Sequence, residues 1–403
     1  MQVIDTDILI VGGGIAGSAL ACALRDAGYR IVLVDQRREP LDTARGDHLQ
    51  PCNVELFARW GVLEKFFSRG AGKRVGHEFR TASGEPLLAA TYDELPVPYP
   101  YFLVFNHDLI AELFLEIAAE NPNFIRLQPV VARNFEIGED GVSALSVELP
   151  DGVKAVIKPH LVVGADGTNS MVRATLRFTA DEHQYIHPMV AMFGPRPAAL
   201  KPLDYFFRYS SSTGMLVIQQ RMNSFIKVTL PVGAEGIAWW KKSTKQNRTD
   251  VLRRRAEVLE EFDSEIAGFY PVKMIHTHEY ARGNVVLIGD AAHSIHPARG
   301  QGLNMGIYSL ANLIRHLPQP KDISKPDKVK ASLQQYQNVQ KPLFDQLIAK
   351  NHESALNMDS TAEGEVEGII RQQDERLRLV HNDPNLRRQH LLDSTGYPFG
   401  LPT

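Results

Sequence analysis

Short, uninterrupted apolar runs near the amino terminus predict buried strands. Residues 5–11 (DTDILIV) and 30–36 (RIVLVDQ) have this character, and residues 15–29 between them predict a helix that ends at Gly28. A strand that is covered on both faces carries an apolar run instead of an alternation. The pattern therefore predicts a β–α–β unit, which opens a doubly wound α/β fold.

Later segments continue this pattern. Residues 161–167 (LVVGADG) and 284–292 (NVVLIGDAA) are further apolar runs that lead into glycine turns. Residues 107–120 place apolar side chains at helical spacing, and residues 331–380 have a mostly helical pattern. We therefore expect a parallel sheet flanked by helices, with more helices toward the carboxyl terminus.

Alternation of apolar and polar residues predicts a second, antiparallel sheet. Residues 74–81 and 86–91 alternate on either side of a Ser-Gly turn, as the two strands of a hairpin do. Between about 185 and 275, the runs DYFFRYSS, GMLVIQQ and FIKVTLPV alternate in the same way. We expect the chain to leave the first domain, build this sheet and return.

Composition and charge exclude several classes of protein. The 403 residues are 44% hydrophobic and 23% charged, and the net charge of −3 gives no reason to expect nucleic acid binding. Two cysteines, Cys22 and Cys52, cannot form a disulfide framework and favour a reducing, cytoplasmic location. We expect no metal site, because no Cys/His ligand spacing occurs, and no transmembrane span.

A glycine motif follows the first predicted strand. Gly12-x-Gly14-x-x-Gly17 also opens the first predicted helix, and Asp35 lies 18 residues after Gly17, at the end of the second strand. This is the dinucleotide-binding fingerprint, in which the helix N-terminus holds phosphates and the acidic residue holds a ribose hydroxyl. The motif leaves NAD and FAD open, because both contain an ADP half.

Two further motifs follow in order, VVGADGTNSMVR (162–173) and GDAAHSIHPARGQGLNMG (289–306). With the first fingerprint they resemble the class A, single-component FAD-dependent aromatic monooxygenases, typified by para-hydroxybenzoate hydroxylase. The segment RGDHLQPCNVELFARWGVLE is most similar to the ubiquinone-type and alkylquinoline-type hydroxylases of that family. The resemblance divides the chain into three parts: a Rossmann-like FAD-binding domain (1–73, 106–184 and 276–330), an inserted substrate domain (a hairpin at 74–105, and 185–275) and a C-terminal helical segment (331–403).

The resemblance implies that FAD is bound. Asp290 would contact the ribityl chain, residues 302–304 would face the flavin ring, and Asp166 would serve both FAD and the visiting nicotinamide cofactor. Asn106 stands where the family often has an arginine, and Tyr308 and Ser309 stand where it often has an acidic residue. The candidate cofactor-binding residues are Gly12, Gly14, Ile15, Ala16, Gly17, Asp35, Gln36, Arg45, Asn106, Val131, Asp166, Asp290, Gly300, Gly302, Leu303 and Asn304.

The resemblance further implies a reaction in which NAD(P)H, or a separate flavin reductase, reduces the flavin. A flavin C4a-hydroperoxide formed with O2 then hydroxylates an aromatic substrate, a reaction typical of secondary metabolism. No catalytic residue is certain; the candidates are Arg45, His48 and Pro297. His293 and His296 lack a third ligand for a metal.

Alternating residues of the predicted sheet are candidates for the substrate pocket, with ordinary core packing as the equal alternative. They are Tyr205, Phe207, Tyr209, Met215 and Val217. Three other functions stay open: a flavin-dependent halogenase, for which GIAWWKK (236–242) is a weak signal, a prenyl reductase, and a non-catalytic flavin-fold binding protein. The oligomeric state is not predicted.

Overall fold

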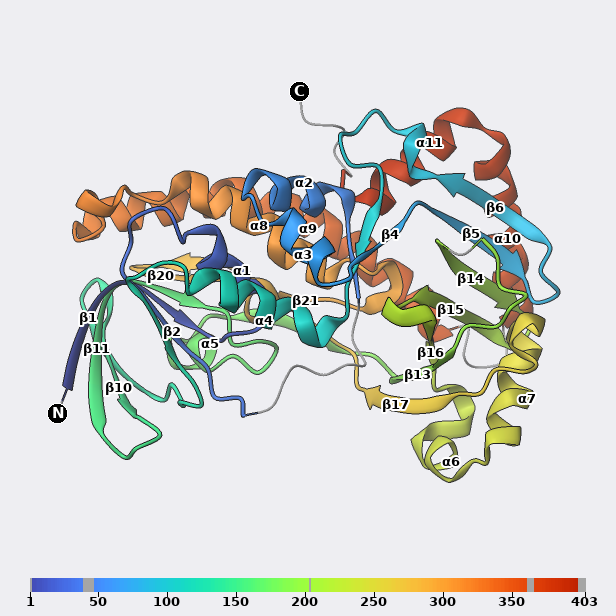
Figure 1. Ribbon diagram of the computed structural model, residues 1–403, viewed down its shortest axis with the longest axis horizontal. Coiled ribbons are helices and arrows are strands. Elements are labelled where there is room, and N and C mark those ends of the chain that lie inside the picture. Colours follow the sequence, from blue (N-terminus) through green and yellow to red (C-terminus); the bar gives the residue numbers. More distant parts are fainter. Residues whose placement is uncertain (1, 39–46, 203, 361–365, 398–403) are drawn as a thin grey trace. The chain divides into compact units, whose positions relative to one another are not determined.

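A computed structural model describes residues 2–38, 47–202, 204–360 and 366–397 (Figure 1). The chain divides into two compact units, each assembled from three stretches. Unit 1 consists of Met1–Asp42, His107–His183 and Lys273–His352. Unit 2 consists of Thr43–Asn106, Gln184–Val272 and Glu353–Thr403.

Unit 1 is built on an eight-stranded sheet with the strand order β19-β20-β11-β1-β2-β8, to which β10 and β9 are added beside β11. The strands β20, β11, β1, β2 and β8 are parallel to one another, as the apolar runs predict. The bounds of the strands are β1 (Gln2–Val11), β2 (Ile31–Val34), β8 (Phe124–Leu127), β9 (Asn134–Gly138), β10 (Gly141–Glu148), β11 (Lys154–Gly164), β19 (Ala281–Arg282) and β20 (Val285–Leu287). A small sheet joins β12 (Ala180–Gln184), β18 (Lys273–Thr277) and β21 (His293–Ser294).

The helices of unit 1 cover this sheet and bury its apolar runs. They are α1 (Ile15–Ala23), α4 (His107–Ala118), α5 (Met171–Thr175), α8 (Gly302–His316) and most of the long α9 (Pro326–Ser360) (Figure 1). Helix α1 contacts α4 and α8. Ile8, Leu9 and Ile10 of β1 are fully buried, and each such side chain contributes about 1.5–3 kcal/mol to folding.

The predicted end of the first helix at Gly28 is wrong. Helix α1 ends at Ala23, because the following turn tightens: the backbone N–H groups of Arg25 and Ala27 donate to carbonyls three residues back, at 3.3 and 3.0 Å. Such i to i+3 bonds close a helix end. Gly28 serves the next turn, where its φ of +84° favours glycine.

Unit 2 contains a seven-stranded sheet with the order β17-β13-β16-β15-β14-β5-β6. The predicted hairpin is confirmed as the antiparallel pair of β5 and β6, and the later alternating runs form β14, β15 and β16. One pair, β14 with β5, is parallel. The bounds are β5 (Gly76–Thr81), β6 (Pro86–Thr91), β13 (Met189–Pro195), β14 (Tyr205–Ser211), β15 (Gly214–Gln220), β16 (Phe225–Pro231) and β17 (Glu265–Tyr270).

Helices lie on both faces of this sheet. Side chains of α6 (Gly236–Lys242) and α7 (Lys245–Arg255) pack on one face, and α10 (Val366–Asn382) contacts β6 and β14. The remaining elements of unit 2 are β3 (His48–Leu49), α2 (Pro51–Arg59), α3 (Leu63–Ser68), β4 (Gly72–Arg74), β7 (Phe102–Val104) and α11 (Pro384–Thr395). Within the described ranges, no helix is long and apolar enough to cross a membrane.

Candidate functional site

The glycine turn after β1 forms a cradle at the carboxyl end of the parallel sheet. Gly12 has φ +108°, and a Cβ there would collide with the backbone of Ala165. A Cβ at Gly17 would collide with the Gly12 carbonyl oxygen, so α1 lies as close to the turn as glycine allows. By contrast, a Cβ at Gly14 would meet nothing within 4 Å. The N-terminus of α1, where Ile15 and Ala16 follow, therefore faces open space without a side-chain cap.

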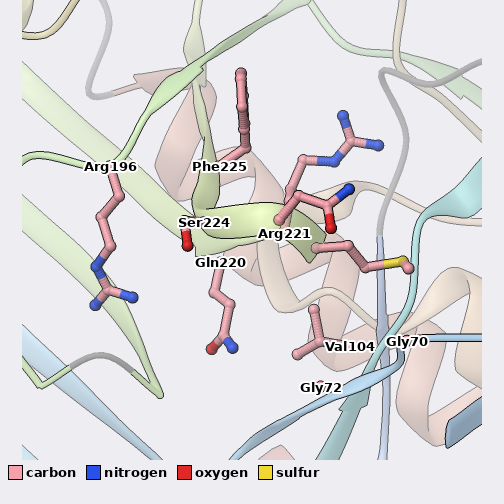
Figure 2. A pocket seen from close by; sticks show the side chains of 10 residues that line it. Gly70, Gly72, Val104, Arg196, Gln220, Arg221, Ser224 and Phe225 are labelled. Atoms are coloured by element: carbon pink, nitrogen blue, oxygen red, sulfur yellow. The ribbon is translucent and has the colours of Figure 1, made fainter.

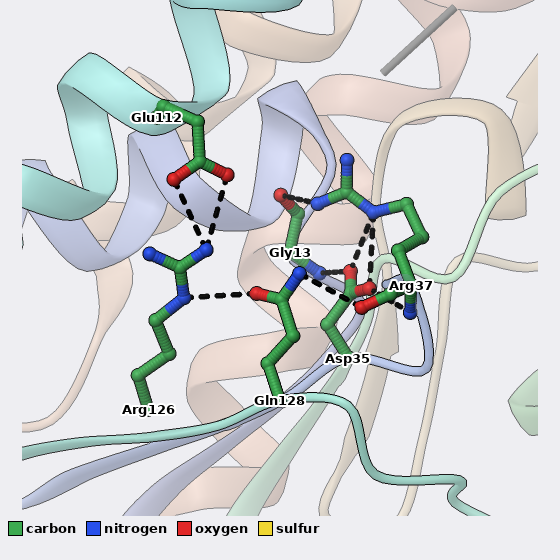
Figure 3. Close-up of polar contacts among 6 residues, drawn as sticks. All are labelled: Gly13, Asp35, Arg37, Glu112, Arg126 and Gln128. Carbon is green, nitrogen blue, oxygen red and sulfur yellow. Dashed lines mark hydrogen bonds and ion pairs between the residues drawn. The ribbon is translucent and has the colours of Figure 1, made fainter. Parts of the chain in front are cut away.

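The Asp35 carboxylate at the end of β2 is the second part of this cradle (Figure 3). It accepts hydrogen bonds from the backbone N–H of Gly13 and, at 2.7 Å, from that of Arg37. The Arg37 guanidinium also donates to it, with Nε 3.0 Å from Oδ1, and to the Gly13 carbonyl oxygen at 2.6 Å. Gln36, between the two, is exposed. Sequence reasoning missed Arg37, although Asp side chains commonly bind the backbone two residues on.

The segment after β8 borders the same end of the sheet. The Val130 N–H donates to the Asp35 carbonyl oxygen at 2.8 Å, and Gln128 donates to the Arg37 carbonyl oxygen at 3.0 Å (Figure 3). Val131 follows directly and is exposed. The structure therefore places this predicted residue next to Asp35.

Asp166 has a structural role that the sequence does not predict. Its carboxylate accepts hydrogen bonds from the Ser170 hydroxyl at 2.5 Å and from the backbone N–H groups of Met171 at 2.6 Å and Val172 at 3.1 Å. These bonds cap the N-terminus of α5, and burial raises the pKa of this carboxyl. In this structure Asp166 thus positions the second motif, and its predicted contact with FAD and the nicotinamide cofactor stays a prediction.

The second and third motifs are tied together by hydrogen bonds. The Arg173 guanidinium on α5 donates to the Ala291 carbonyl oxygen at 2.9 Å and to that of Thr168 at 2.6 Å. The Thr168 hydroxyl lies 3.5 Å from an Asp290 carboxylate oxygen. Asp290 is thereby fixed beside the cradle.

The third motif also meets the first. A Cβ at Gly289 would lie 2.9 Å from that of Ala16 on α1, and one at Gly306 would lie 3.5 Å from the Gly289 Cα. Two glycines, 289 and 306, thus allow α1 and α8 to approach closely. The structure brings together residues that are more than 270 positions apart.

The first residues of α8 present a second helix N-terminus. Gly302, Leu303 and Asn304 begin the helix, and no side chain caps it. Gly300 has φ +61°, which favours glycine, and its carbonyl oxygen accepts a 3.2 Å hydrogen bond from the buried Asn304 side chain. Such a terminus attracts negative charge.

The histidines of the third motif are structural. His293 is buried against Phe344, at 4.7 Å between ring centroids, and burial lowers its pKa to about 3. His296 caps the turn that follows, since its Nδ1 accepts from the Ala298 N–H at 2.9 Å. The Asn351 side chain donates to the His296 carbonyl oxygen at 2.9 Å and accepts from the His296 backbone N–H at 3.1 Å.

Of the three catalytic candidates, Arg45 lies outside the described residues. Pro297 is exposed at the start of its turn. His48 is buried in unit 2, where its Nε2 lies 2.9 Å from the Gln220 carbonyl oxygen and its Nδ1 lies 2.8 Å from the Arg74 guanidinium. Burial and Arg74 lower the His48 pKa to about 3, so this side chain stays neutral.

Asn106 was selected as a cofactor-binding candidate because the family often has an arginine there. Its side-chain Oδ1 is buried and has no hydrogen-bond partner in the part of the chain that the structure describes. Buried polar atoms are nearly always paired. This acceptor is thus available to a donor on a ligand.

The five predicted pocket residues do not share one face of the sheet. Phe207 pairs with Ile218 and Tyr209 with Leu216, so these side chains point the same way, into the core that α6 and α7 cover. Tyr205 packs against that core too. Three of the five candidates therefore belong to ordinary core packing, which is the alternative that the sequence leaves open.

The opposite face carries Met215 and Val217, which alternate with Leu216 and Ile218. Across the strands, Arg208 lies opposite Val217, and Val217 lies opposite Thr229. The next row holds Gln219 opposite Lys227. We define these six side chains as the polar face of unit 2: Arg208, Met215, Val217, Gln219, Lys227 and Thr229.

A hollow of about 270 Å³ opens at the hairpin that joins β15 to β16 (Figure 2). Arg196, Gln220 and Arg221 line it. Arg221 also lies over the Phe193 ring, at 4.0 Å, and 3.2 Å from the buried Asp47 carboxylate. Basic side chains border this hollow, and the apolar side chains of Val104, Met222 and Phe225 also line it.

The tryptophan pair that weakly indicated a halogenase belongs to the core. Trp240 on α6 is fully buried, and its indole N–H donates to the Val232 carbonyl oxygen at 3.1 Å. Trp239 packs on it edge-to-face, with ring centroids 5.2 Å apart. Packing accounts for both residues.

Comparison with known proteins confirms the family resemblance. The profile of FAD binding domains matches residues 5–349. The chain is 27% identical to aklavinone 12-hydroxylase DnrF of Streptomyces peucetius over 333 residues, which cover 75% of this chain and 65% of DnrF. It is 24% identical to ubiquinone hydroxylase UbiL of Rhodospirillum rubrum over 355 residues, 83% of this chain and 78% of UbiL.

Solved structures share the fold. The p-nitrophenol 4-monooxygenase PnpA of Pseudomonas putida DLL-E4 superposes with a TM-score of 0.85 at 20% identity, and the full length of both chains is covered. The chain spans less than two thirds of the length of DnrF.

Proposed function

Because the chain belongs to the family of FAD binding domains, we propose that it is an FAD-dependent monooxygenase. It uses NAD(P)H and O2 to hydroxylate an aromatic, quinone-like or quinolone-like small molecule. The observation that carries the proposal is the convergence of the three motifs at the carboxyl end of the parallel sheet of unit 1. In open α/β sheets this end is where nucleotides bind.

The residues of unit 1 fit FAD. The open space at Gly14 is a cradle that a Cβ would fill, at a helix N-terminus that suits the pyrophosphate. The Asp35 carboxylate would accept hydrogen bonds from the ribose hydroxyls. The hydrogen bonds that Arg37 donates to this carboxylate would then break. Asp290 would hold the ribityl chain, and the first N–H groups of α8 would face the flavin.

When bound, FAD supplies the electron transfer and the O2 chemistry. The chain supplies binding and electrostatics. With FAD bound, the backbone N–H groups of Gly302 and Leu303 at the start of α8 would stabilise negative charge on the flavin, because they carry the positive end of the helix dipole.

The substrate class is supported by the printed activities of similar proteins. PnpA is a p-nitrophenol 4-monooxygenase, and DnrF hydroxylates aklavinone. Both names point to oxygenated ring compounds. The substrate of this chain therefore belongs to the same chemical class. The similarity to DnrF supports a role in secondary metabolism.

O2 and an NAD(P)H reductant complete the proposed reaction, with a separate flavin reductase as the alternative electron source. A cytoplasmic location is consistent with Cys22 and Cys52, which are both buried and not joined in a disulfide.

The purified protein tests this proposal directly. It is expected to carry an oxidised flavin spectrum and to oxidise NADH or NADPH with uptake of O2, faster when a hydroxyarene is added. A colourless protein that does not take up FAD would support a non-catalytic binding protein instead. A flavin that NADH and NADPH do not reduce, but that reacts with O2 after chemical reduction, would point to the separate reductase.

A further inference from the structure

The Asp35 carboxylate, which the cradle offers to the ribose of FAD, is fully engaged by the chain itself. Its Oδ1 accepts from the Arg37 backbone N–H at 2.7 Å and from the Arg37 side-chain Nε at 3.0 Å. Its Oδ2 accepts from the Gly13 backbone N–H and from the same Nε at 3.1 Å. A carboxylate offers about four acceptor positions, two on each oxygen. All of them are taken.

Two of these bonds come from main-chain groups that the fold holds in place. The segment after β8 fixes the backbone of residues 35–37, because the Val130 N–H donates to the Asp35 carbonyl oxygen at 2.8 Å. The Gln128 side chain donates to the Arg37 carbonyl oxygen at 3.0 Å (Figure 3). The Arg37 side chain is therefore the donor that can move. A ribose hydroxyl reaches Asp35 only where this side chain gives way.

The position of the Arg37 Nε matches the positions that the ribose needs. The Nε lies 3.0 and 3.1 Å from the two carboxylate oxygens, so it takes one acceptor position on each. The adenosine ribose carries two neighbouring hydroxyl groups, which the acidic residue of this fingerprint binds. Two hydroxyl donors need one free position on each oxygen. The arginine thus occupies the place of both hydroxyls.

The Arg37 guanidinium also joins the two parts of the cradle. Its Nη2 donates to the Gly13 carbonyl oxygen at 2.6 Å, so it links the end of β2 to the glycine turn after β1 (Figure 3). The Asp35 and Arg37 side chains are only 5% and 22% exposed. An ion pair so shielded from water is stronger than one at the surface. Arg37 therefore stabilises the cradle before FAD enters.

We propose that Arg37 competes with the adenosine ribose of FAD for the Asp35 carboxylate, and that it thereby lowers the affinity of the protein for FAD. FAD binding breaks the ion pair, places two ribose hydroxyls on the carboxylate and leaves the guanidinium to the solvent. No covalent bond changes. A ligand that binds only the open form of a site binds more weakly by the fraction of protein that is open. The inference rests on the FAD site of the proposed function and not on its reaction.

Competition has a signature that the other roles of an arginine lack. Removal of an arginine that contacts bound FAD would weaken FAD binding. Removal of a purely structural arginine would lower stability and would not tighten FAD binding. Competition predicts changes in opposite directions for Arg37: a less stable apoprotein and a tighter complex with FAD.

The test titrates apoprotein, prepared by removal of FAD, with FAD and follows the flavin fluorescence. Arg37→Met keeps an apolar stem and removes the donors of the guanidinium. We expect it to bind FAD about tenfold more tightly than the wild-type protein, and to melt at a lower temperature without FAD. Arg37→Lys keeps the charge without the planar fork and should lie between the two. Calorimetry with ADP, the half of FAD that carries this ribose, should show the same gain.

Arg30→Met is the matched control. Arg30 precedes β2 and donates to the Asp7 carboxylate at 2.7 Å, so this variant removes an equal charge and a similar ion pair from the opposite end of the strand. It should lower the melting temperature and leave the FAD affinity unchanged. A second control places Arg37→Met in an Asp35→Ala background. No gain in FAD affinity is expected there, because the contested carboxylate is absent.

Unchanged or weaker binding of FAD and ADP by Arg37→Met would overturn the proposal. An equal gain in Arg30→Met, or a gain that persists in the Asp35→Ala background, would do the same. If Arg37→Met does not fold, the titration of Arg37→Lys decides.

The outcomes also separate this inference from the proposed function. Failure of both the wild-type protein and Arg37→Met to bind FAD would overturn the two together. Tighter FAD binding by Arg37→Met, in a protein that never oxidises NAD(P)H, would keep this inference and refute the proposed reaction.

Discussion

The Lys227 ammonium lies 2.9 Å from the Asp47 carboxylate, and both side chains are closed off from solvent. Arg221 approaches the same carboxylate, with Nε at 3.2 Å. Lys227 is 180 positions from Asp47 in the chain. This ion cluster joins the loop before β3 to the polar face of the sheet.

Asp47→Asn should destabilise the protein by about 3–5 kcal/mol, because it leaves two cations buried beside a neutral amide. Urea unfolding measures the change. Asp263→Asn is the matched control: its partner Lys245 and Asp263 itself are exposed, and such a pair contributes about 0–1 kcal/mol. Equal effects of the two variants would contradict the role of the buried cluster.

The cradle predicts different outcomes for two glycines of one motif. Gly14 has φ −64°, which alanine adopts, and its Cβ would enter the open space, so Gly14→Ala should keep the melting temperature and weaken FAD binding about tenfold or more. Gly17→Ala should lower the melting temperature of the apoprotein, since its Cβ would collide with the Gly12 carbonyl oxygen. Melting curves and flavin fluorescence titrations measure both effects. Unchanged FAD affinity in Gly14→Ala would refute the cradle.

Stability should fall below neutral pH. The pKa of His293 is about 3 in the folded protein, against about 6.5 in an unfolded chain, so below pH 6.5 only the unfolded state takes up this proton. Each such histidine, His48 included, removes about 1.4 kcal/mol of stability per pH unit until the pH nears 3. His293→Leu should reduce this loss of stability by about 1.4 kcal/mol per pH unit. Urea unfolding at several pH values between 6 and 4 measures the change. The same exchange at the exposed His381 should leave it unchanged.

Thr229→Val should leave stability unchanged or raise it, because it replaces a buried hydroxyl without a partner by a methyl group of the same shape. Melting curves measure the change. Thr229→Ser keeps the hydroxyl and serves as the control. A Thr229→Val variant with a clearly lower melting temperature than the wild-type protein would contradict this account of the hydroxyl.

Local patterns predict the cradle because its chemistry is local. Gly12, Gly14 and Asp35 lie where the strand, turn and helix pattern puts them. Asp166 differs, because a carboxylate four residues before Ser170 can cap the next helix, and the motif alone does not distinguish a cap from a ligand contact.

The alternation of apolar and polar residues does not separate pocket candidates from core residues. A period of two shows that two faces exist and leaves open which one is covered. The tight turn between Ser211 and Gly214 sets the register of β14 and β15. It places Arg208 opposite Val217, and so determines which residues of the two strands share a face. The contact between α10 and β14 has no such signal, because only the fold brings these two elements together.

The proposed function depends on one step, the flavin-dependent transfer of one atom of O2 to an aromatic ring. Mass spectrometry of the product formed with NAD(P)H under 18O2, in a panel of hydroxyarenes, measures this step. We expect a product that carries one 18O atom from the gas and none from water. A product whose new oxygen comes from water, or consumption of NAD(P)H with no labelled product from any hydroxyarene, would contradict the proposed function.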